Sequence, residues 1–238
     1  MKKYFCKKGV TLIVALALTA GLSLTAFAAE PTDSAPQGAS EGSAWQNPFE
    51  GVRETDWYYH NAEYVYVNNL FSGTSAATFA PNTPMTRGML VTVLGRMSGV
   101  DVSGYTSSFD DVSDAAYYAK YTEWAREQGI VSGVGGNSFA PDRIITRQDM
   151  AVMLARYAAA MKLQAPAMNT GTAFADAGKI AAYAKDAAAS MQKAGIISGK
   201  QGGVFDPEAG ATRAEVSVML HRFQLLFSNA GDAVVIAP

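Results

Sequence analysis

The sequence contains few of the side chains that carry most enzymatic and metal chemistry. It has one cysteine, Cys6, and two histidines, His60 and His221, which stand outside any HExxH or GxSxG motif. A single cysteine excludes an intramolecular disulfide bond. These absences predict a non-enzymatic protein without a metal or cofactor. A glycan hydrolase that uses two carboxylates stays an alternative, because 21 acidic residues always provide a pair.

The first 28 residues have the three parts of a secretory signal peptide. An apolar run from about Val10 to Leu24 follows four lysines, and a small-x-small cleavage pattern ends at Ala28. The run is shorter than the roughly 20 residues that a membrane span needs. Cys6 precedes the run, whereas a lipid-anchoring cysteine would follow it. We therefore expect a secreted protein that lies outside the cytoplasmic membrane, with no membrane span after cleavage.

The charge of the remaining chain is negative. The signal holds four of the 19 Lys and Arg residues and none of the 21 acids, so 15 positive charges face 21 negative ones, a net charge of −6. Such a surface gives no electrostatic reason to bind nucleic acid. An anionic ligand would have to be held by cations placed close together.

Three segments repeat the same residues at the same spacing. They are SGTSAATFAPNTPMTRGML from Ser72, SGVGGNSFAPDRIITRQDM from Ser132 and SGKQGGVFDPEAGATRAEV from Ser198. An aromatic residue stands sixteen positions before the glycine of each segment. The pattern indicates internal triplication, and repeated units usually bury their apolar faces against one another. The predicted divisions are a signal peptide (1–28), a flexible lead-in (29–48), three repeats (49–104, 105–168 and 169–228) and a tail (229–238).

Each repeat is predicted to form a helix, a loop and a second helix. The first helices extend over about 57–67, 115–127 and 180–193, and they end before Asn69, Gly129 and Gly195, residues that tolerate a left-handed backbone. Each second helix has an apolar stripe with the spacing i, i+3, i+4, i+7, and we expect the three stripes to pack together. The stripes are Leu90, Val93, Leu94 and Met97; Met150, Met153, Leu154 and Tyr157; and Val216, Met219, Leu220 and Phe223.

An arginine follows the threonine that begins each second helix. Thr212 and Glu215 predict a capping box, and Thr146 and Asp149 predict the same device with a shorter acid. The arginine itself opposes the helix dipole, at a cost of about 0.3–1 kcal/mol.

Two explanations of this arginine stay open. Arg147 and Arg213 either form ion pairs with the acids that open the repeats, or they face a groove and bind a carboxylate or phosphate. In the second case, alanine at these positions would leave the stability nearly unchanged, because surface ion pairs contribute about 0–1 kcal/mol. The acids concerned are Asp110 or Asp111, and Asp176.

Together these motifs resemble the S-layer homology family. The resemblance is carried by Phe109-Asp-Asp-Val112, Gly129-Ile-Val-Ser-Gly133, Phe139-Ala-Pro141 and the TRAE sequence at Thr212–Glu215. It implies a mainly α fold in which three helix-loop-helix repeats form a pseudo-threefold prism around a central three-helix bundle. It also implies a module that binds the cell wall non-covalently. The ligand would be a secondary cell-wall polymer, a polysaccharide ending in pyruvylated N-acetylmannosamine, bound in grooves between repeats.

The resemblance also implies ligand-binding residues. The arginines would hold the pyruvyl carboxylate, the Ser-Gly pairs would contact the sugar, the two aspartates would orient the arginine or a sugar hydroxyl, and aromatic rings would stack on the sugar. These residues are Arg87, Arg147 and Arg213; Ser72, Gly73, Ser132, Gly133, Ser198 and Gly199; Asp111 and Asp176; and Tyr64 and Trp124. Core packing is the alternative role for the aromatic residues.

The first repeat departs from the pattern, because Gly51 and Met89 replace two acids. We therefore expect the site around Arg87 to contribute least. A protein-binding array that holds another envelope or surface-layer protein is the alternative function.

Overall fold

The computed structural model describes residues 45–164 and 167–231, and this part of the chain is helical without a β-strand. The predicted signal peptide, most of the lead-in and the end of the tail lie outside the described residues. No helix in the described part has the length and apolar character needed to cross a membrane.

The order of elements confirms a mainly α protein with two helices in each repeat. The first helices begin at residues 59, 119 and 185, later than the predicted 57, 115 and 180, because tight turns or 3-10 turns occupy the residues before them. The α-helices are α1 Tyr59–Val67, α2 Arg87–Ser98, α3 Ala119–Glu127, α4 Arg147–Ala160, α5 Lys185–Lys193 and α6 Arg213–Gly231, and the 3-10 turns are η1 Ala177–Lys179, η2 Ala182–Ala184 and η3 Gln201–Gly203.

The predicted helix boundaries depend on local backbone chemistry. Asn69, Gly129 and Gly195 have φ values of 55°, 69° and 72°, so each first helix ends on a left-handed residue as predicted. At each second helix a threonine hydroxyl accepts a hydrogen bond from the backbone N–H three residues later, and these threonines are Thr86, Thr146 and Thr212.

Only the third repeat completes the capping box. The Glu215 carboxylate accepts a hydrogen bond from the Thr212 backbone N–H at 2.9 Å, which makes the contact reciprocal. The predicted counterpart Asp149 does not bond to the Thr146 backbone N–H. Its oxygens instead accept from Arg143 and from the Tyr183 hydroxyl. The shorter acid therefore leaves this capping box half formed.

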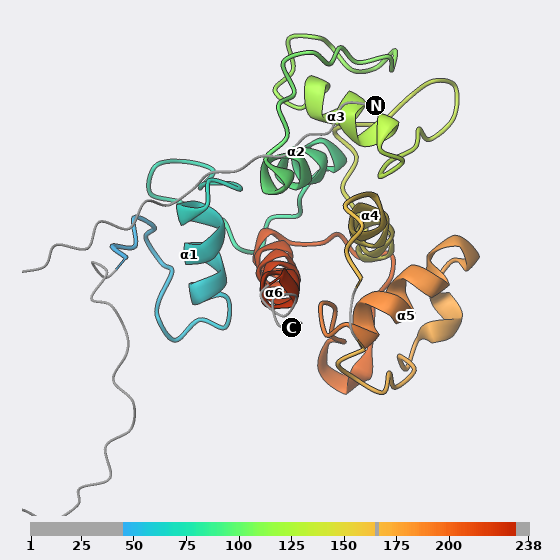
Figure 1. Ribbon diagram of the computed structural model, residues 1–238. Coiled ribbons are helices and arrows are strands. Elements are labelled where there is room, and N and C mark those ends of the chain that lie inside the picture. The colour runs from blue at the N-terminus through green and yellow to red at the C-terminus, as the bar shows by residue number, and fades with distance from the viewer. Residues whose placement is uncertain (1–44, 165–166, 232–238) are drawn as a thin grey trace, which may run out of the picture. The chain divides into compact units, whose positions relative to one another are not determined.

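Each second helix packs along the first helix of another repeat. Helix α2 packs on α3, α4 on α5, and α6 returns to α1, as Figure 1 shows. The close contact of α2 with α3 requires glycine, because a Cβ atom at Gly95 would lie 2.2 Å from the Tyr121 ring. The predicted stripes are buried except for Met97, which is half-buried. Between stripes, the rings of Tyr157 and Phe223 lie 5.6 Å apart.

Three backbone hydrogen bonds link the repeats in a cycle just before the second helices. The N–H of Met85 donates to the carbonyl of Ala211, Ala211 donates to Ile145, and Ile145 donates to Met85, each at 2.9 Å. All three residues are buried. The cycle joins the third repeat to the first as directly as it joins neighbours in the sequence.

The first N–H groups of each second helix also form hydrogen bonds from one repeat to another. An α-helix leaves these groups without an internal partner, and burial without a partner is costly. Here the loop of another repeat supplies the carbonyls: Gly88 donates to Pro141 at 2.8 Å, Gln148 to Pro207 at 3.0 Å, and Ala214 to Pro81 at 3.0 Å. Each repeat caps only the third N–H of its own second helix, through its threonine, and depends on another repeat for the first two.

The repeated arginine crosses the same junction and is buried. Arg87, Arg147 and Arg213 are only 6%, 2% and 5% exposed. Their Nε atoms donate to the carbonyls of Phe139, Phe205 and Phe79, and their Nη2 atoms donate to those of Ser132, Ser198 and Ser72. Each guanidinium also lies over a phenylalanine ring. Charge-assisted hydrogen bonds of this kind contribute about 1.5–3 kcal/mol each, which offsets the unfavourable helix dipole.

The predicted ion pairs are therefore wrong, and the burial of these arginines argues against the predicted tolerance to alanine. Asp111 and Asp176 accept hydrogen bonds from backbone N–H groups, and Asp110 accepts one from the Asn137 side chain. The carboxylate that Arg147 meets is Glu215, at 2.7 Å. The sequence spacing within one repeat did not reveal that the guanidinium enters another repeat. Removing such a buried arginine would leave two carbonyl acceptors without their hydrogen-bond donor.

We predict that Arg147→Ala lowers the free energy of unfolding by about 3–5 kcal/mol, because it removes the closest ion-pair partner of Glu215 and unpairs the carbonyls of Phe205 and Ser198. For a chain of this size, this corresponds to a melting temperature roughly 10 °C lower. Arg143→Ala is the control, because the Arg143 side chain is 50% exposed and an exposed pair contributes about 0–1 kcal/mol. Equal melting temperatures for the two variants would contradict the structural role.

The contact between α6 and α1 holds a histidine. The His221 ring stacks on Tyr64 with centroids 4.2 Å apart, and its Nδ1 lies 3.0 Å from the Asn61 Oδ1. Burial lowers the pKa of His221 below its ordinary value of 6.5, His60 lowers it further, and Glu63 partly opposes the shift.

Acid should therefore weaken this contact. A histidine with a lowered folded-state pKa binds its proton more readily when unfolded, so its contribution is complete above about pH 6.5 and is lost as the pH falls through and below that value. Thermal melts at pH 7.5 and 5.5 should show a larger acid-induced decrease for the unmodified protein than for His221→Gln. His60→Gln, at a side chain that is 79% exposed, should keep most of the decrease, because burial is the larger cause of the lowered pKa of His221. An equal decrease in all three proteins would exclude a role for His221.

Candidate functional site

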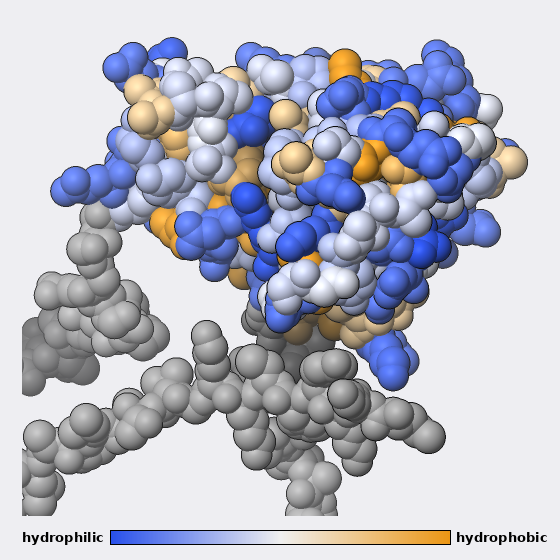
Figure 2. Space-filling view, turned by 90° about the horizontal axis from the view of Figure 1, so that it is seen from above, coloured by the Kyte–Doolittle hydropathy of each residue, from blue (hydrophilic) through white to orange (hydrophobic). Residues whose placement is uncertain are grey.

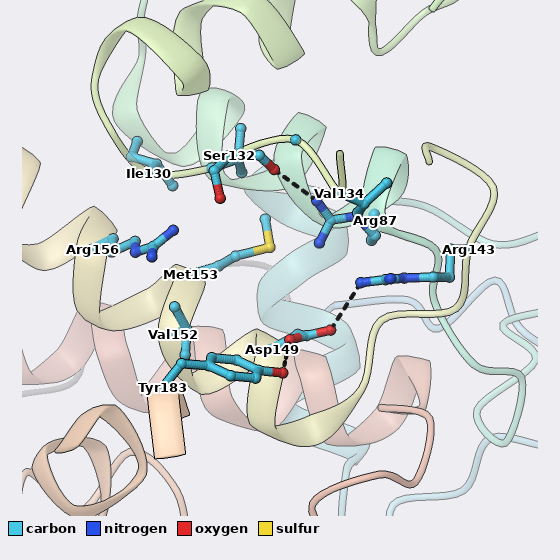
Figure 3. Close-up of a pocket in the computed structure, with 12 residues that line it drawn as sticks. Arg87, Ile130, Ser132, Val134, Arg143, Asp149, Val152, Met153, Arg156 and Tyr183 are labelled. Carbon is cyan, nitrogen blue, oxygen red and sulfur yellow. Dashed lines mark hydrogen bonds and ion pairs between the residues drawn. The ribbon is translucent and has the colours of Figure 1, made fainter. Parts of the chain in front are cut away.

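A pocket of about 260 Å³ forms where all three repeats meet. Arg87 comes from the start of α2, Ser132 and Gly133 come from the loop after α3, and Tyr183 comes from η2. Figure 3 shows the guanidinium groups of Arg87, Arg143 and Arg156 around this space, with the Tyr183 ring below it. We call it the Arg87 pocket. The remaining lining residues are Ile130, Val131, Val134, Arg143, Asp149, Val152, Met153 and Arg156.

A second pocket, of about 440 Å³, has the same construction one repeat further on. We call it the Arg147 pocket. Its arginine comes from α4, its Ser-Gly pair from the third repeat and its exposed aromatic residue, Trp57, from the first. Counted from the Ser-Gly glycine, Arg222 stands where Arg156 stands in the Arg87 pocket, and Glu215 stands where Asp149 stands. The lining residues are Trp57, Asn61, Arg147, Ser198, Gly199, Lys200, Glu215, Val218, Met219 and Arg222.

The third joint differs from the other two. A pocket of about 860 Å³ is lined by Ser72 and by Arg96, the residue equivalent to Arg156 and Arg222. Its other walls include Tyr66, Phe71 and Tyr121, whereas Gly73 and Arg213 do not line it. Met89 occupies the position of the acid in this repeat.

The two arginine pockets are electropositive and have one aromatic wall. Burial is the main cause that lowers the pKa of Arg87, and Arg143 lowers it further. Burial and the hydrogen bond to Asp149 raise the pKa of Tyr183 to about 12, so its phenol stays protonated at neutral pH. Fixed guanidinium groups beside an aromatic ring can bind an anionic group that is attached to a ring-shaped ligand.

The Ser-Gly pairs shape the pocket walls mainly through their backbone. Each serine carbonyl accepts from an arginine Nη2 atom. The glycines have no room for a side chain in the first two repeats, because a Cβ atom would lie 2.4 Å from the Ser75 carbonyl oxygen at Gly73 and 2.8 Å from that of Ser138 at Gly133. Gly133 and Gly199 line their pockets.

Asp111 and Asp176 lie beneath the loops and do not line the pockets. Both oxygens of Asp111 accept backbone N–H bonds, from Phe139 and Ala140, and Asp176 does the same for the third repeat. Ala140 and Asp206 have φ values of 57°, a conformation that costs about 1–2 kcal/mol. The aspartates stabilise this backbone, which directs the phenylalanine carbonyls towards the arginines.

The aromatic residues at the pockets are different from those predicted. Trp124 is 2% exposed and belongs to the core, which is the alternative role considered for it. Trp57 and Tyr183 are 65% and 61% exposed and line the two pockets. These residues, together with Arg156 and Arg222, were missed from sequence, although each recurs at a fixed distance from the Ser-Gly glycine.

The two replaced acids on which the predicted weakness of the Arg87 site rests lie at a different joint. Gly51 and Met89 share a repeat with Arg87, but Arg87 binds the loop of the second repeat. The loop of the first repeat receives Arg213 instead. Whether the sites differ in affinity stays a prediction. The described residues include no group of three or more His, Cys, Asp or Glu side chains arranged to hold a metal ion.

Comparison with known proteins gives three matches to one family model. The model of the S-layer homology domain matches residues 48–88, 108–151 and 173–217. Among curated relatives, an endoglucanase of Bacillus sp. (strain KSM-635) is 29% identical over 215 residues, which cover 90% of this chain and 22% of that protein.

Two further relatives are named for the cell surface. The surface-layer 125 kDa protein of Lysinibacillus sphaericus is 35% identical over 112 residues, covering 45% of this chain and 10% of that protein. The cellulosome-anchoring protein of Acetivibrio thermocellus is 28% identical over 130 residues, covering 50% and 28%. The chain thus matches less than a third of the length of each of these relatives. With three matches in tandem over more than half of its residues, the chain belongs to the S-layer homology domain family.

Proposed function

We propose that this protein attaches non-covalently to the bacterial cell wall by binding a secondary cell-wall polymer with a pyruvylated sugar in the pockets between its repeats. Family membership and relatives named as surface-layer and anchoring proteins place it at the cell surface. The observation that carries the proposal is the repeated pocket, in which a buried arginine, an exposed arginine, a Ser-Gly loop and an exposed aromatic ring converge.

The charges of the pocket fit a carboxylate. In the described residues, Arg156 has no hydrogen bond or ion pair, and it lines the same pocket as Arg87. Two guanidinium groups that enter one pocket from different helices can bind the two oxygens of a carboxylate. A pyruvyl ketal supplies this carboxylate on a rigid ring.

The aromatic wall fits a sugar face. Tyr183 and Trp57 are exposed and stand next to the arginines, so a sugar ring can lie on the aromatic face while its carboxylate reaches the guanidinium groups. The face of the protein in Figure 2 is mostly hydrophilic and shows apolar residues only in small separate areas. A stable protein partner usually binds a large exposed apolar patch, so this hydrophilic face suits a glycan better.

We also infer the pseudo-threefold prism and its central three-helix bundle. The inference is supported by the cycle of hydrogen bonds through Met85, Ile145 and Ala211 and by the packing of α6 on α1. This arrangement gives three joints, of which two form the arginine pockets.

Wall binding should depend on the exposed arginines. We predict that Arg156→Ala with Arg222→Ala reduces sedimentation with native walls more than tenfold, because each loss removes a charge-assisted contact of about 1.5–3 kcal/mol. The melting temperature should stay within about 4 °C, because both side chains are exposed.

Arg53→Ala is the control, because Arg53 is exposed outside both arginine pockets. Walls stripped of their secondary polymer should no longer retain the unmodified protein. Retention on stripped walls, or full retention of the double variant on native walls, would refute the proposed function.

Trp57 provides a direct optical test. It is 65% exposed, whereas Trp124 is buried, so a sugar that stacks on Trp57 should change the tryptophan fluorescence. We expect this change on adding pyruvylated glycan and its absence in Trp57→Phe. Trp57→Ala should weaken glycan binding in the Arg147 pocket by more than about 1 kcal/mol. An unchanged response in Trp57→Phe would show that the ring does not contact the ligand.

A further inference from the structure

The two arginine pockets have the same framework, but their charged side chains make different contacts. In the Arg147 pocket, the Glu215 Oε1 atom accepts from the Arg147 Nη1 atom at 2.7 Å, and Oε2 accepts from the Thr212 backbone. Arg222 donates to the Ser198 hydroxyl at 3.1 Å. Lys200 lies 3.9 Å from Glu215 and 2.7 Å from Asp206. Both arginines that would bind a carboxylate are therefore already engaged within the protein.

In the Arg87 pocket the equivalent acid contacts other partners. Asp149 is one methylene shorter than Glu215, and it accepts from Arg143 at 3.2 Å and from the Tyr183 hydroxyl at 2.7 Å. Figure 3 shows both bonds, and it shows the Arg87 guanidinium bonded to Ser132 on the far side of the pocket from Asp149. Among the described residues, the Arg87 Nη1 atom has no hydrogen-bond partner.

We propose that the acid at the third position of the second helix determines which pocket binds a carboxylate. Asp149 leaves Arg87 and Arg156 open to the ligand. Glu215 places the protein's own carboxylate on Arg147, where a ligand carboxylate would have to replace it. The inference rests on the proposed function for its ligand, and it names Glu215 as the residue that makes the two sites unequal.

Competition explains the size of the effect. A carboxylate held in place by the same chain acts at an effective concentration in the millimolar range or above, so a free ligand must exceed it before binding. Glu215 is also fixed by its bond to the Thr212 backbone, which keeps Oε1 directed at Arg147. The Arg147 pocket should therefore bind a carboxylate at least about tenfold more weakly than the Arg87 pocket.

Backbone NMR can measure each pocket separately. Purified ¹⁵N-labelled protein is titrated with pyruvylated N-acetylmannosamine, and dissociation constants are read from the amides of residues 132–134 for the Arg87 pocket and 198–200 for the Arg147 pocket. In the unmodified protein, we expect the constant at 132–134 to be at least about tenfold lower.

Two substitutions test the acid itself. Glu215→Gln keeps a side chain that serves in a capping box, and it should lower the constant at 198–200 about tenfold without changing the one at 132–134. Asp149→Glu should raise the constant at 132–134. Thermal melts of both variants check that the fold is intact.

Asp206→Asn is the matched control. It removes an acidic charge close to the same pocket, but Asp206 contacts Lys200 and not Arg147. Its left-handed backbone, with φ of 57°, also suits asparagine. We expect no change at 198–200 beyond twofold. Equal constants in the two pockets of the unmodified protein, or equal effects of Glu215→Gln and Asp206→Asn, would overturn the proposal.

A second probe separates this inference from the proposed function. Pyruvate ion carries the carboxylate without the sugar, and the same titrations are repeated with it. If the sugar shifts no amide in either pocket, the proposed function fails, and the pyruvate series still decides whether Glu215 excludes a carboxylate. If neither probe shifts an amide in the unmodified protein or in Glu215→Gln, both proposals are wrong.

Discussion

The structure depends on how the buried starts of the second helices satisfy their backbone N–H groups. For the first two of these groups the acceptors are carbonyls of a loop in another repeat, as in the bond from Gln148 to Pro207. A repeat taken alone would lose these hydrogen bonds, and keeping the same groups buried without partners would cost about 1–3 kcal/mol for each. Because Ala214 donates back to Pro81, the third repeat completes the first. The three repeats therefore form one cooperative unit.

The same joint explains why an arginine occupies an unfavourable place at a helix start. Its Nε and Nη2 atoms reach two carbonyls across the junction, as Arg87 does with Phe139 and Ser132. A guanidinium has a third nitrogen, which remains for the pocket or, at Arg147, for Glu215. Stability and the proposed ligand contact thus share one side chain. The second arginine of each pocket, such as Arg156, is exposed and separable from the fold.

The local features of each repeat could be predicted from the sequence, whereas the contacts between repeats could not. Helical periodicity identified the buried stripes, and residues such as Asn69 and Thr212 marked helix ends, because these signals act within a few residues. The partner of Arg87 lies 52 residues away, and spacing inside one repeat does not indicate which neighbour supplies the loop. Asp111 instead bonds to the backbone of Phe139 and Ala140 in its own repeat, a loop contact that no sequence motif indicated. Trp124 lies on a helix with apolar positions, so sequence alone did not distinguish core packing from exposure.

The pocket walls differ between the copies, whereas the joint beneath them does not. The arginine, phenylalanine and proline of the joint are the same in every repeat, because each has a partner across the junction. The pocket residues differ: Asp149 and Glu215 correspond to Met89, and Val134 corresponds to Lys200. These side chains can change without removing the hydrogen bonds of the joint. A triplicated fold of this kind can therefore hold its framework constant while each joint acquires a different affinity.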